Sequence, residues 1–516
     1  MPVYLHPGVY VEEISSGSKP IEAVGTSTAA FVGFTAKGPL DEATLITSFD
    51  DYERVYGGIR DLGTAPEGDP MGFSVAAFFL NGGTKAYVHR VATGAVAATA
   101  DLPSASPPDD HLAFTAVNPG KWANDLVVRV ALKDGTADAY TVNVGRYAVP
   151  GDNTSDFQVL ESYSDVSLDA ASPRFIEAVL NGVSENVTVQ VVITSPPLSP
   201  PFGITSSSEA TLGGGADGAD GGLANYSDVF DGLLKVRDVN MLCLPGHPWD
   251  TAADQSIVQA ALAHAGTTKN RMVIIDPATG SELTQESDVT SLSLPTKSYG
   301  AFYYPWVKVA NPFFDEERNP GAPVTLLVPP CGYAAGAWAK VDGRRGVWKA
   351  PAGVETQLLG VAGLEHTVED AEQDFLNPLG VNALRTLPGY GRVIWGSRTL
   401  STKADPEWRY VPVRRTAMFI EESLYNGIQW AVFEPNSHQL WSSLRSNAES
   451  FMDGLFRSGA FQGEKASDAY FVRCGLGDTM TQADVDRGQV IVIVGFAPAK
   501  PAEFVIVRIQ QKVAQQ

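Results

Sequence analysis

The sequence predicts an α/β (α+β) fold of several domains, and three features of its pattern lead to this class. Near the start, a buried strand, a short helix and a second strand follow one another, as in layered α/β folds. From residue 223 onward apolar strands alternate with helical segments, which favours a mixed, partly parallel sheet flanked by helices. Between residues 92 and 222 alternating strands are separated by turns rich in Pro, Ser and Asp, which predicts a β-rich insertion.

The first α/β segment has clear start and stop signals. Its predicted elements are a strand at Thr28–Gly33, a helix at Ser48–Gly57, an apolar segment at Phe73–Leu80 and a strand at Lys85–Val91. Ser48 or Asp50 can cap the helix, and Gly57 can end it. This order predicts a β-α-β layer.

The insertion is predicted to contain mainly strands, and the segment after it to alternate between helices and strands. In the insertion, Asp125–Leu132 and Asp138–Gly145 alternate as half-buried strands do, and the glycine run Gly213–Gly222 closes the unit. After it we expect helices at Tyr226–Val236 and Gln255–Ala265, and strands at Val239–Leu244, Arg271–Ile275, Ala301–Val309 and Val324–Val328.

The last hundred or so residues predict a further unit around one long helix. In Gln439–Phe456 the apolar residues recur at i, i+3 and i+4 and form one stripe, with Asn436 or Ser437 as candidate N-cap. Gln489–Gly495 is apolar on both faces, which predicts a central strand. Pro498 and Pro501 break the chain after it.

Both ends of the chain carry apolar segments that have the pattern of β-strands without a partner nearby in the sequence. These segments include Val9, Tyr10, Val11, Glu12 and Ile14 at the start and Phe504, Val505, Ile506, Val507 and Ile509 near the end. Unpaired apolar edge strands are an aggregation hazard that monomers normally blunt. Two interpretations remain open: the strands pair with neighbouring copies by strand addition, or the two ends pair with each other inside one domain.

The composition excludes several classes of protein. The chain has 516 residues, of which 44% are hydrophobic and 19% charged, an ordinary globular balance. Its formal net charge of −22 argues against nucleic-acid binding, because phosphate contacts need a basic surface. Cys243, Cys331 and Cys474 are far apart, so reduced thiols without a metal are expected. No secretion signal or long apolar run is visible, so we expect cytoplasmic assembly without membrane insertion.

One short motif imitates a serine nucleophile. Gly25–Ala29 matches the segment around a subtilisin-type serine at Ser27. That arrangement needs an aspartate and a histidine earlier in the chain. The histidine that precedes Ser27 is His6, which is next to Pro7, and the acidic residues there are glutamates. A turn at the entry of a strand is therefore the favoured interpretation.

A second motif imitates a dinucleotide-binding loop. Gly213, Gly215 and Gly218 have the spacing of the glycine fingerprint. The preceding segment is polar, however, and Asp217 and Asp220 would repel a pyrophosphate. We interpret the run as a flexible or turn-forming linker, and we expect no catalytic residue, metal or cofactor.

One compact basic cluster stands out in this acidic chain. It consists of Arg344, Arg345 and Lys349. Such a cluster can hold an anion, but in an acidic protein an ion pair with a neighbouring subunit is the favoured interpretation.

Several stretches carry a family resemblance. They are Tyr4–Glu13, Thr26–Pro39, Asn118–Asn124, Pro329–Pro330 with Ala335–Gly336 and Asp342, Arg345–Pro351, Trp395–Leu400, Trp408–Val411, Phe433–Asn436 and Phe496–Phe504. Together they resemble the contractile tail sheath proteins of phages, pyocins and related injection systems. Ala123 stands where the family usually has glycine, and Cys331 and Gly353 stand where serine and asparagine are commoner. The resemblance is weak across residues 92–222.

The resemblance implies a structural subunit and not an enzyme. Such subunits polymerise in helically stacked hexameric rings around an inner tube, and the sheath contracts to drive the tube through a target envelope. The energy comes from a metastable extended lattice. The implied partners are further copies of the chain, an inner tube protein, and baseplate and terminal cap proteins, in a phage tail or tail-like particle that can be released from the cell.

The resemblance also implies a division of the chain. Residues 1–25 are an N-terminal arm of the inner core domain, residues 26–91 and 223–400 a discontinuous middle α/β domain, residues 92–222 an outer insertion, and residues 401–516 the C-terminal inner core domain with a strand arm. The helix Gln439–Phe456 is expected to face the tube through Arg445, Glu449 and Asp453, or to be a purely buried core helix. Two rival classes are a monomeric subtilisin-like serine hydrolase and a surface-layer or adhesin protein.

Overall fold

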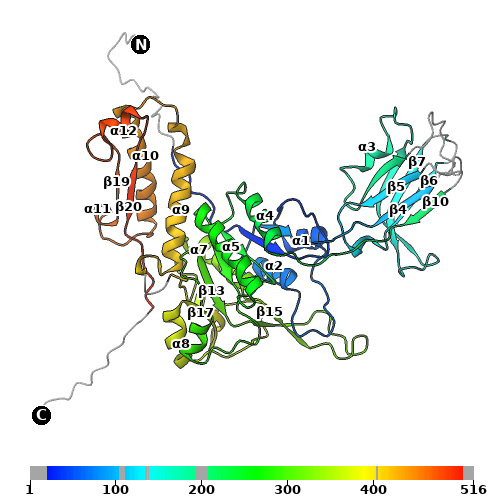
Figure 1. The fold of residues 1–516 in the computed structure, drawn as a ribbon, viewed down its shortest axis with the longest axis horizontal. Coiled ribbons are helices and arrows are strands. Elements are labelled where there is room, and N and C mark those ends of the chain that lie inside the picture. Colours follow the sequence, from blue (N-terminus) through cyan, green and yellow to red (C-terminus); the bar gives the residue numbers. More distant parts are fainter. Residues whose placement is uncertain are drawn as a thin grey trace, which may run out of the picture.

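The computed structural model describes residues 20–103, 111–133, 136, 139–192, 207–401 and 405–503. Within these residues three units lie side by side (Figure 1). A central α/β unit separates a β-rich unit, on the right, from a C-terminal unit with two long helices, on the left. The α/β class predicted from the sequence is confirmed.

The central unit contains an eight-stranded sheet. In spatial order its strands are β18 (Gly391–Ile394), β17 (Val381–Leu387), β13 (Gly300–Tyr304), β12 (Met272–Ile275), β11 (Met241–Cys243), β1 (Ala29–Gly33), β3 (Ala86–Arg90) and β2 (Thr44–Ile46). The strands from β17 to β3 are parallel, and each edge strand is antiparallel to its neighbour. Residues in β1 alternate between two hydrophobic cores, with Phe31 in one and Val32 in the other.

Helices cover both faces of this sheet, which explains why its strands are apolar on both sides. One core contains residues of α1 (Phe49–Tyr56), α2 (Pro70–Leu80) and α7 (Cys331–Arg345). The other contains residues of α4 (Leu223–Leu233), α5 (Ala252–Thr268), α6 (Glu286–Ser291) and α8 (Asp370–Leu376). A small sheet lies beside them, built from β15 (Thr325–Val328), β14 (Val307–Ala310) and β16 (Gly363–Leu364). Short 3₁₀ turns occur at η2 (Val354–Thr356) and η3 (Asn377–Leu379).

The caps of α1 agree with the sequence prediction. The Ser48 side chain accepts a hydrogen bond from the Asp51 amide, at 3.1 Å. Gly57 ends the helix in the left-handed region, with φ of 89°, which glycine adopts without strain. By contrast, the predicted single strand Ala301–Val309 is two strands, β13 and β14, because Pro305 between them has no N–H to donate to a ladder.

The β-rich unit consists of two antiparallel sheets that enclose their own core. One sheet has the order β10 (Ser207–Thr211), β6 (Val127–Leu132), β7 (Tyr140–Tyr147), β8 (Phe157–Val166), and the other β4 (Thr99–Pro103), β5 (His111–Ala116), β9 (Val187–Val192). Helix α3 (Ile176–Leu180) and the 3₁₀ turn η1 (Lys121–Ala123) accompany them. In β5, alternate residues are buried, as expected for a strand with one face in the core.

The two connections between the β-rich and central units run side by side. Antiparallel bridges join Thr93 to Ala219, Val96 to Ala216, and Thr99 to Gly213. A Cβ at Gly215 would lie 2.4 Å from the Gly120 carbonyl oxygen, so glycine is needed there for close approach. The glycine run is therefore a paired connection, which fits the turn-forming alternative of the sequence interpretation and not the flexible one.

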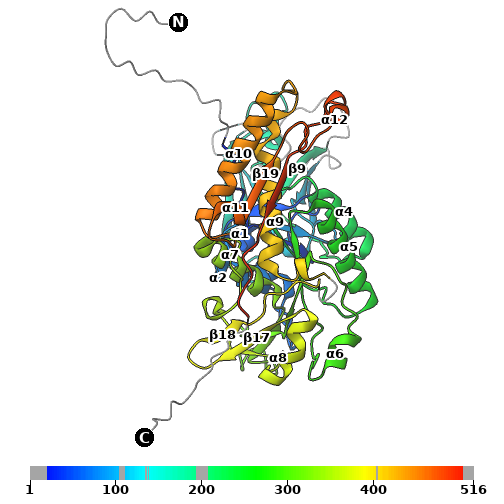
Figure 2. The ribbon, with the colours of Figure 1, turned by 90° about the vertical axis from the view of Figure 1, so that its left-hand side faces the viewer.

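The C-terminal unit is built on α9 (Val411–Gly427) and α10 (His438–Arg457), seen from the side in Figure 2. Its further elements are η4 (Pro406–Trp408), η5 (Gln429–Ala431), α11 (Ala466–Ala469), α12 (Gln482–Asp486) and the two strands β19 (Tyr470–Arg473) and β20 (Ile493–Phe496). The predicted stripe of α10 is confirmed, since its apolar side chains are buried against α9 and the strands. Ser437 occupies the N-cap, without a side-chain cap bond.

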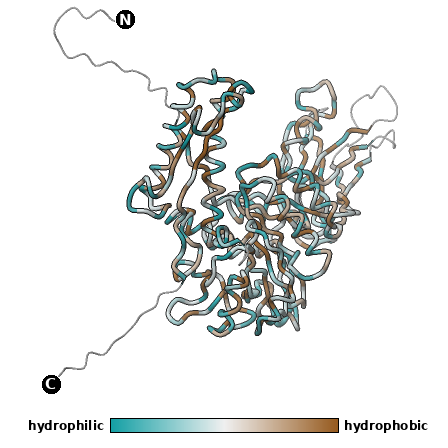
Figure 3. The backbone as a smooth tube through the Cα atoms, turned by 60° about the vertical axis from the view of Figure 1, so that its left-hand side comes forward, coloured by the Kyte–Doolittle hydropathy of each residue, from teal (hydrophilic) through white to brown (hydrophobic). Residues whose placement is uncertain are grey.

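Hydrophobic segments run through the interior of the central unit and also along the C-terminal unit, as Figure 3 shows. The short sheet of the C-terminal unit contains the last strand predicted from the sequence. The predicted strand Gln489–Gly495 appears as β20, displaced toward the C-terminus. Within the described part of the chain it pairs with β19 alone, so there it is an edge strand and not the central strand that the sequence predicted.

Candidate functional site

The serine-protease-like segment is anchored by a buried ion pair. Arg415 of α9 and Asp342 of α7 have side chains that are 2% exposed, and two hydrogen bonds of 2.9 and 2.5 Å join them. The Thr26 hydroxyl donates to Asp342 at 2.7 Å, and the Thr26 carbonyl accepts from Arg415 at 2.9 Å. The segment around Ser27 thus enters β1 while tied to both helices. This arrangement matches the strand-entry turn expected from the sequence.

The described residues contain no group of three His, Cys, Asp or Glu side chains placed to hold a metal ion. Each of Cys243, Cys331 and Cys474 is a buried free thiol. Among the helices that the structure describes, none combines the length and the apolar character needed to cross a membrane.

The small β19–β20 sheet leaves large apolar side chains in contact with solvent. Phe471 is 47% exposed, Ile493 is 43% exposed, and Ile491 just before β20 is 37% exposed. An isolated two-stranded antiparallel sheet is marginally stable in water. In this unit α10 covers one side of the sheet, through Phe451, Leu455 and their neighbours. Among the described residues no third strand pairs with β19 or β20.

The N-terminal boundary of the described chain lies against the same unit. Ile21 is buried in the core formed by α9 and α10. The Val24 amide donates to the Ser423 hydroxyl at 3.2 Å. The predicted arm residues Val9, Tyr10, Val11, Glu12 and Ile14 lie outside the described residues.

The C-terminal boundary is anchored by a second charged contact. Arg398 donates from Nε and Nη2 to the Glu503 carboxylate, at 3.1 and 2.5 Å, and both side chains are largely buried. The Tyr410 hydroxyl lies 3.4 Å from the same carboxylate. Glu503 is the last described residue. The predicted C-terminal arm follows this anchor and lies outside the described residues; its members are Phe504, Val505, Ile506, Val507 and Ile509.

The three residues proposed to face a tube have different surroundings along α10. Arg445 is half-buried and donates to the Cys474 carbonyl at 3.2 Å, which ties α10 to the end of β19. Asp453 forms a 2.7 Å ion pair with Arg457, and Glu449 is exposed. Burial and the nearby carboxylates of Asp453 and Glu449 raise the pKa of Tyr470. The helix therefore has a buried apolar side and a separate polar side that carries both acidic and basic residues.

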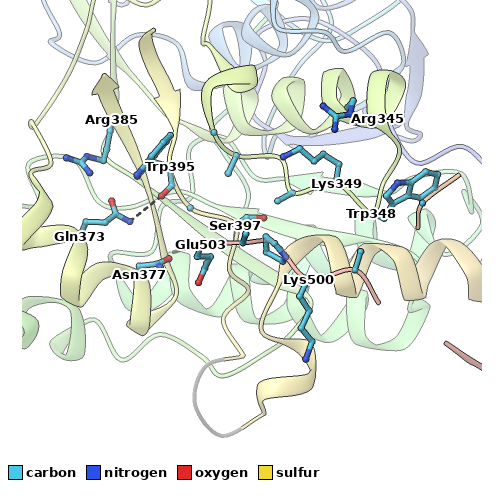
Figure 4. Close-up of a pocket in the computed structure, with 18 of the residues that line it drawn as sticks. Arg345, Trp348, Lys349, Gln373, Asn377, Arg385, Trp395, Ser397, Lys500 and Glu503 are labelled. Carbon is cyan, nitrogen blue, oxygen red and sulfur yellow. Dashed lines mark hydrogen bonds between the residues drawn. The ribbon is translucent and has the colours of Figure 1, made fainter. Parts of the chain in front are cut away.

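The predicted basic cluster borders a large pocket at the junction of the central and C-terminal units. Arg344 and Arg345 are in the last turn of α7, and Arg345 pairs with Glu355 at 2.7 Å. Arg345 and Lys349 line a pocket of about 890 Å³. Figure 4 shows Arg385 and Trp395 on one side of it and Arg345, Lys349 and Trp348 on the other, with Glu503 between them.

Two features of these surfaces have weak signals in the sequence. The Arg398–Glu503 pair joins residues 105 positions apart, and no local pattern links them. Phe433 is fully exposed at the end of the helix pair α9–α10, with φ of 71°, an unusual backbone for a bulky residue. In the sequence, the position of Phe433 directly before Glu434-Pro435 is the feature that could have indicated an exposed turn.

Comparison with known proteins identifies the class to which this fold belongs. Residues 222–400 match the phage tail sheath protein central domain, and residues 403–512 match the phage tail sheath C-terminal domain. Together the two models cover more than half of the 516 residues. The chain belongs to the phage tail sheath family.

Individual relatives agree with this assignment. The tail sheath protein of Burkholderia phage BcepMu is 33% identical over 170 residues, which are 32% of this chain and 34% of that protein. The match thus spans about a third of that curated relative. The contracted helical sheath of the anti-feeding prophage has a TM-score of 0.60 at 24% identity, over 99% of this chain and 100% of that chain. The contracted sheath of an extracellular contractile injection system, PVC, gives 0.58 at 23% identity, with 100% of both chains covered.

Proposed function

We propose that this protein is a sheath subunit of a phage tail or a phage tail-like contractile particle. Copies of the chain assemble in the cytoplasm as helically stacked hexameric rings around an inner tube protein, between a baseplate and a terminal cap. The assembled sheath shortens and drives the tube through a target envelope. Its energy is stored in the metastable extended lattice, and the subunit is structural and not an enzyme. Family membership and the full-length likeness of the fold to contracted sheaths support this proposal.

The observation that carries the proposal is the two-stranded β19–β20 sheet, whose core also contains Ile21 near the N-terminal end of the described chain. The exposed side chains of Phe471 and Ile493 would be buried by an added strand. The apolar segments at both ends of the sequence have the pattern of such strands. An added strand of about five or six residues makes several backbone hydrogen bonds, each worth roughly 0.5–1.5 kcal/mol. Burial of Val505, Val507 and Ile509 would add roughly 1.5–3 kcal/mol for each side chain. Such a link can persist while weaker contacts between subunits exchange.

In this proposal the anchors at the described boundaries transmit load between copies. The Arg398–Glu503 pair holds the start of the C-terminal arm, and the buried Ile21 holds the end of the N-terminal arm. The arms, including Val9–Val11 and Phe504–Val507, then act as tethers that are completed by neighbouring subunits. The β-rich unit lies on the outer surface of the particle, away from the tube.

Truncation tests the tethers. Deletion of residues 504–516 keeps the Glu503 anchor, and deletion of residues 1–14 keeps the buried Ile21. Each variant should remain folded, with a melting temperature close to that of the full chain, and should fail to form tubes in electron micrographs. Val183→Ser, a change at an exposed position of the β-rich unit, serves as the control and should assemble normally. Long tubes from either truncated chain would contradict strand exchange.

The tube contact is tested on α10. Glu449 is exposed and has no ion-pair partner among the described residues, so Glu449→Lys should leave the fold intact. If the polar face of α10 contacts the tube, this variant should polymerise by itself but co-assemble poorly with the tube protein. Normal co-sedimentation with the tube would assign α10 to a purely internal role.

A further inference from the structure

The pocket beside the basic cluster carries unpaired positive charge. Within the described residues Arg345 and Arg385 have ion-pair partners, Glu355 and Asp370, at 2.7 and 2.8 Å. Lys349 and Lys500 line the same pocket and have no ion-pair partner in the described part of the chain. These two lysines come from the segment after α7 and from the chain just before Glu503.

The carboxylates of the pocket do not neutralise both lysines. Asp370 is paired with Arg385, and Glu503 is paired with Arg398. Asp374 is a pocket carboxylate that has no ion-pair partner among the described residues. The pocket therefore has a small excess of positive charge in a chain whose formal net charge is −22. Its walls also include aromatic surface, since Trp348 and Trp395 line it and Trp395 is 38% exposed.

The loop between β14 and β15 has the complementary chemistry. It contains Phe314, which is 40% exposed, followed by Asp315, Glu316 and Glu317. Glu316 and Glu317 are exposed and lack ion-pair partners among the described residues, whereas Asp315 pairs weakly with Arg318 at 3.6 Å. An exposed aromatic residue next to free carboxylates fits a pocket with tryptophans and free lysines.

Hydrogen bonds fix the shape of this loop in the free subunit. The Asp315 carboxylate accepts from the amides of Glu317 and Arg318, each at 3.0 Å. At the base of the loop, the buried Asn311 donates to the Pro323 carbonyl at 2.9 Å and accepts from the Phe313 amide at 2.9 Å. A preorganised loop loses less conformational entropy on binding than a mobile one.

The loop and the pocket lie on different sides of the central unit. In Figure 1 β15, which follows the loop, lies to the right of α8 and β17, which contribute to the pocket at the lower left of this unit. A contact between two different surfaces is heterologous, and it builds closed rings or helical stacks when it repeats.

From these observations we propose that the β14–β15 loop of one subunit docks into the pocket of a second copy. Glu316 and Glu317 pair with Lys349 and Lys500 of that copy, and Phe314 enters the aromatic part of the pocket. This inference rests on the proposed function, because it assigns a lateral contact in the same sheath. The contact differs from the terminal strands in being charge-dependent, so it is the contact that salt should weaken.

A charge exchange tests the pairing. One variant carries Glu316→Lys with Glu317→Lys, a second carries Lys349→Glu with Lys500→Glu, and a third carries all four changes. Each double variant should raise the concentration needed for tube formation at least tenfold, and the fourfold variant should return within threefold of the wild type. Tube formation is measured by sedimentation and electron microscopy, and melting temperatures establish that each variant is folded.

The control places the same charge change elsewhere. Asp228→Lys with Asp231→Lys reverses two exposed carboxylates on α4 and should assemble within threefold of the wild type. If a charge-reversal variant melts early, it is replaced by Lys349→Gln with Lys500→Gln or by Glu316→Gln with Glu317→Gln, with an expected effect of at least fivefold, outside the threefold margin of the control. Phe314→Ala should weaken assembly and should not be rescued by the charge exchange.

The possible failures are distinguishable. If wild-type tubes form and the charge variants assemble equally well, the docking is wrong and the proposed function stands. If the double variants fail and the fourfold variant is not rescued, the direct pairing is also overturned. If the wild-type chain forms no tubes under any condition, the proposed function fails and this contact fails with it.

Discussion

The eight-stranded sheet of the central unit and the two-stranded sheet of the C-terminal unit differ in how their apolar residues are covered. In the central sheet every residue of β1 is buried, and helices cover both faces. In the C-terminal sheet Phe471 and Ile493 remain largely exposed. The central sheet is thus completed by its own chain, whereas the small sheet is incomplete within the described residues.

This difference separates two sources of stability. Burial in the central unit stabilises the monomer, since each apolar side chain removed from water contributes about 1.5–3 kcal/mol. Exposed apolar side chains on β19 and β20 stabilise nothing until a partner covers them. A change in the first region should therefore alter the melting temperature, and a change in the second should alter assembly. The predictions below test this division.

The largest effect is expected at the ion pair that joins the central and C-terminal units. Asp342→Ala leaves the buried guanidinium of Arg415 without its carboxylate, and removal of one partner of a buried pair costs about 3–5 kcal/mol. Chemical denaturation of the monomer measures this loss. The control is Glu355→Ala, which removes one partner of the exposed Arg345–Glu355 pair and should cost less than about 1 kcal/mol. Equal losses in the two variants would show that the buried Arg415–Asp342 pair contributes no more to the stability of the monomer than a surface ion pair does.

The second prediction compares one residue from each sheet. Leu242 of β11 is fully buried, so Leu242→Ala should lower the free energy of unfolding by about 2–5 kcal/mol. Ile493→Ala, at an exposed position of β20, should change it by less than about 0.5 kcal/mol. The second variant should instead reduce tube formation. A large loss of monomer stability from Ile493→Ala would mean that the small sheet is already complete.

The same comparison explains what the sequence could and could not predict. Local signals located α1 through Ser48 and Gly57, and the 3.6-residue period located α10. The apolar run at Gln489–Gly495 indicated a central strand because both of its faces are hydrophobic. In the described chain the strand has one neighbour, β19. The hydrophobic pattern of a sequence predicts which face of a strand must be buried. It does not predict whether the same chain or another copy of it covers that face.

Contacts between distant residues were beyond the reach of sequence patterns. Arg90 is buried and donates to the carbonyls of Gly38, Pro119 and Asp217, at 3.0, 2.7 and 3.0 Å. These bonds fix the β-rich unit to the central sheet across up to 127 positions in the sequence. From the sequence, the acidic side chain of Asp217 indicated only that the glycine run does not bind phosphate. In the structure the Asp217 backbone carbonyl accepts a hydrogen bond from Arg90, and this role is visible only once the chain is folded.

The third prediction concerns pH and the connection to the β-rich unit. His247 lies between Asp220, at 3.1 Å, and Asp254, at 2.8 Å, with the Tyr226 hydroxyl at 2.7 Å. Burial lowers the pKa of His247, but hydrogen bonds to Asp220 and Asp254 outweigh burial and raise that pKa above 6.5. A raised pKa in the folded state contributes stability below pH 6.5, and this stability is lost as the pH rises through the folded-state value.

The matched measurement is the difference between the wild type and His247→Gln. The melting temperature of the wild type should fall more steeply above pH 6.5 than that of the variant. Burial raises the pKa of Asp276 to about 7, which also makes stability fall with rising pH, but this contribution is common to both proteins. Burial and Arg271 lower the pKa of His264 to about 4, so His264 stays neutral in this range. Parallel profiles for the two proteins would exclude a charged His247.

The smallest expected change in the free energy of unfolding comes from the N-caps of two helices, α1 of the central unit and α10 of the C-terminal unit. Ser48 accepts a hydrogen bond from the Asp51 amide, so Ser48→Ala should cost about 1 kcal/mol, the usual value for loss of an N-cap. Ser437 stands at the N-cap of α10 without such a bond, and Ser437→Ala should therefore change the free energy of unfolding by less than about 0.5 kcal/mol. If Ser437→Ala proves as costly as Ser48→Ala, α10 depends on its own cap more than on packing against α9 and the small sheet. The same chemical change thus separates a helix start held by its cap from one held by tertiary contacts.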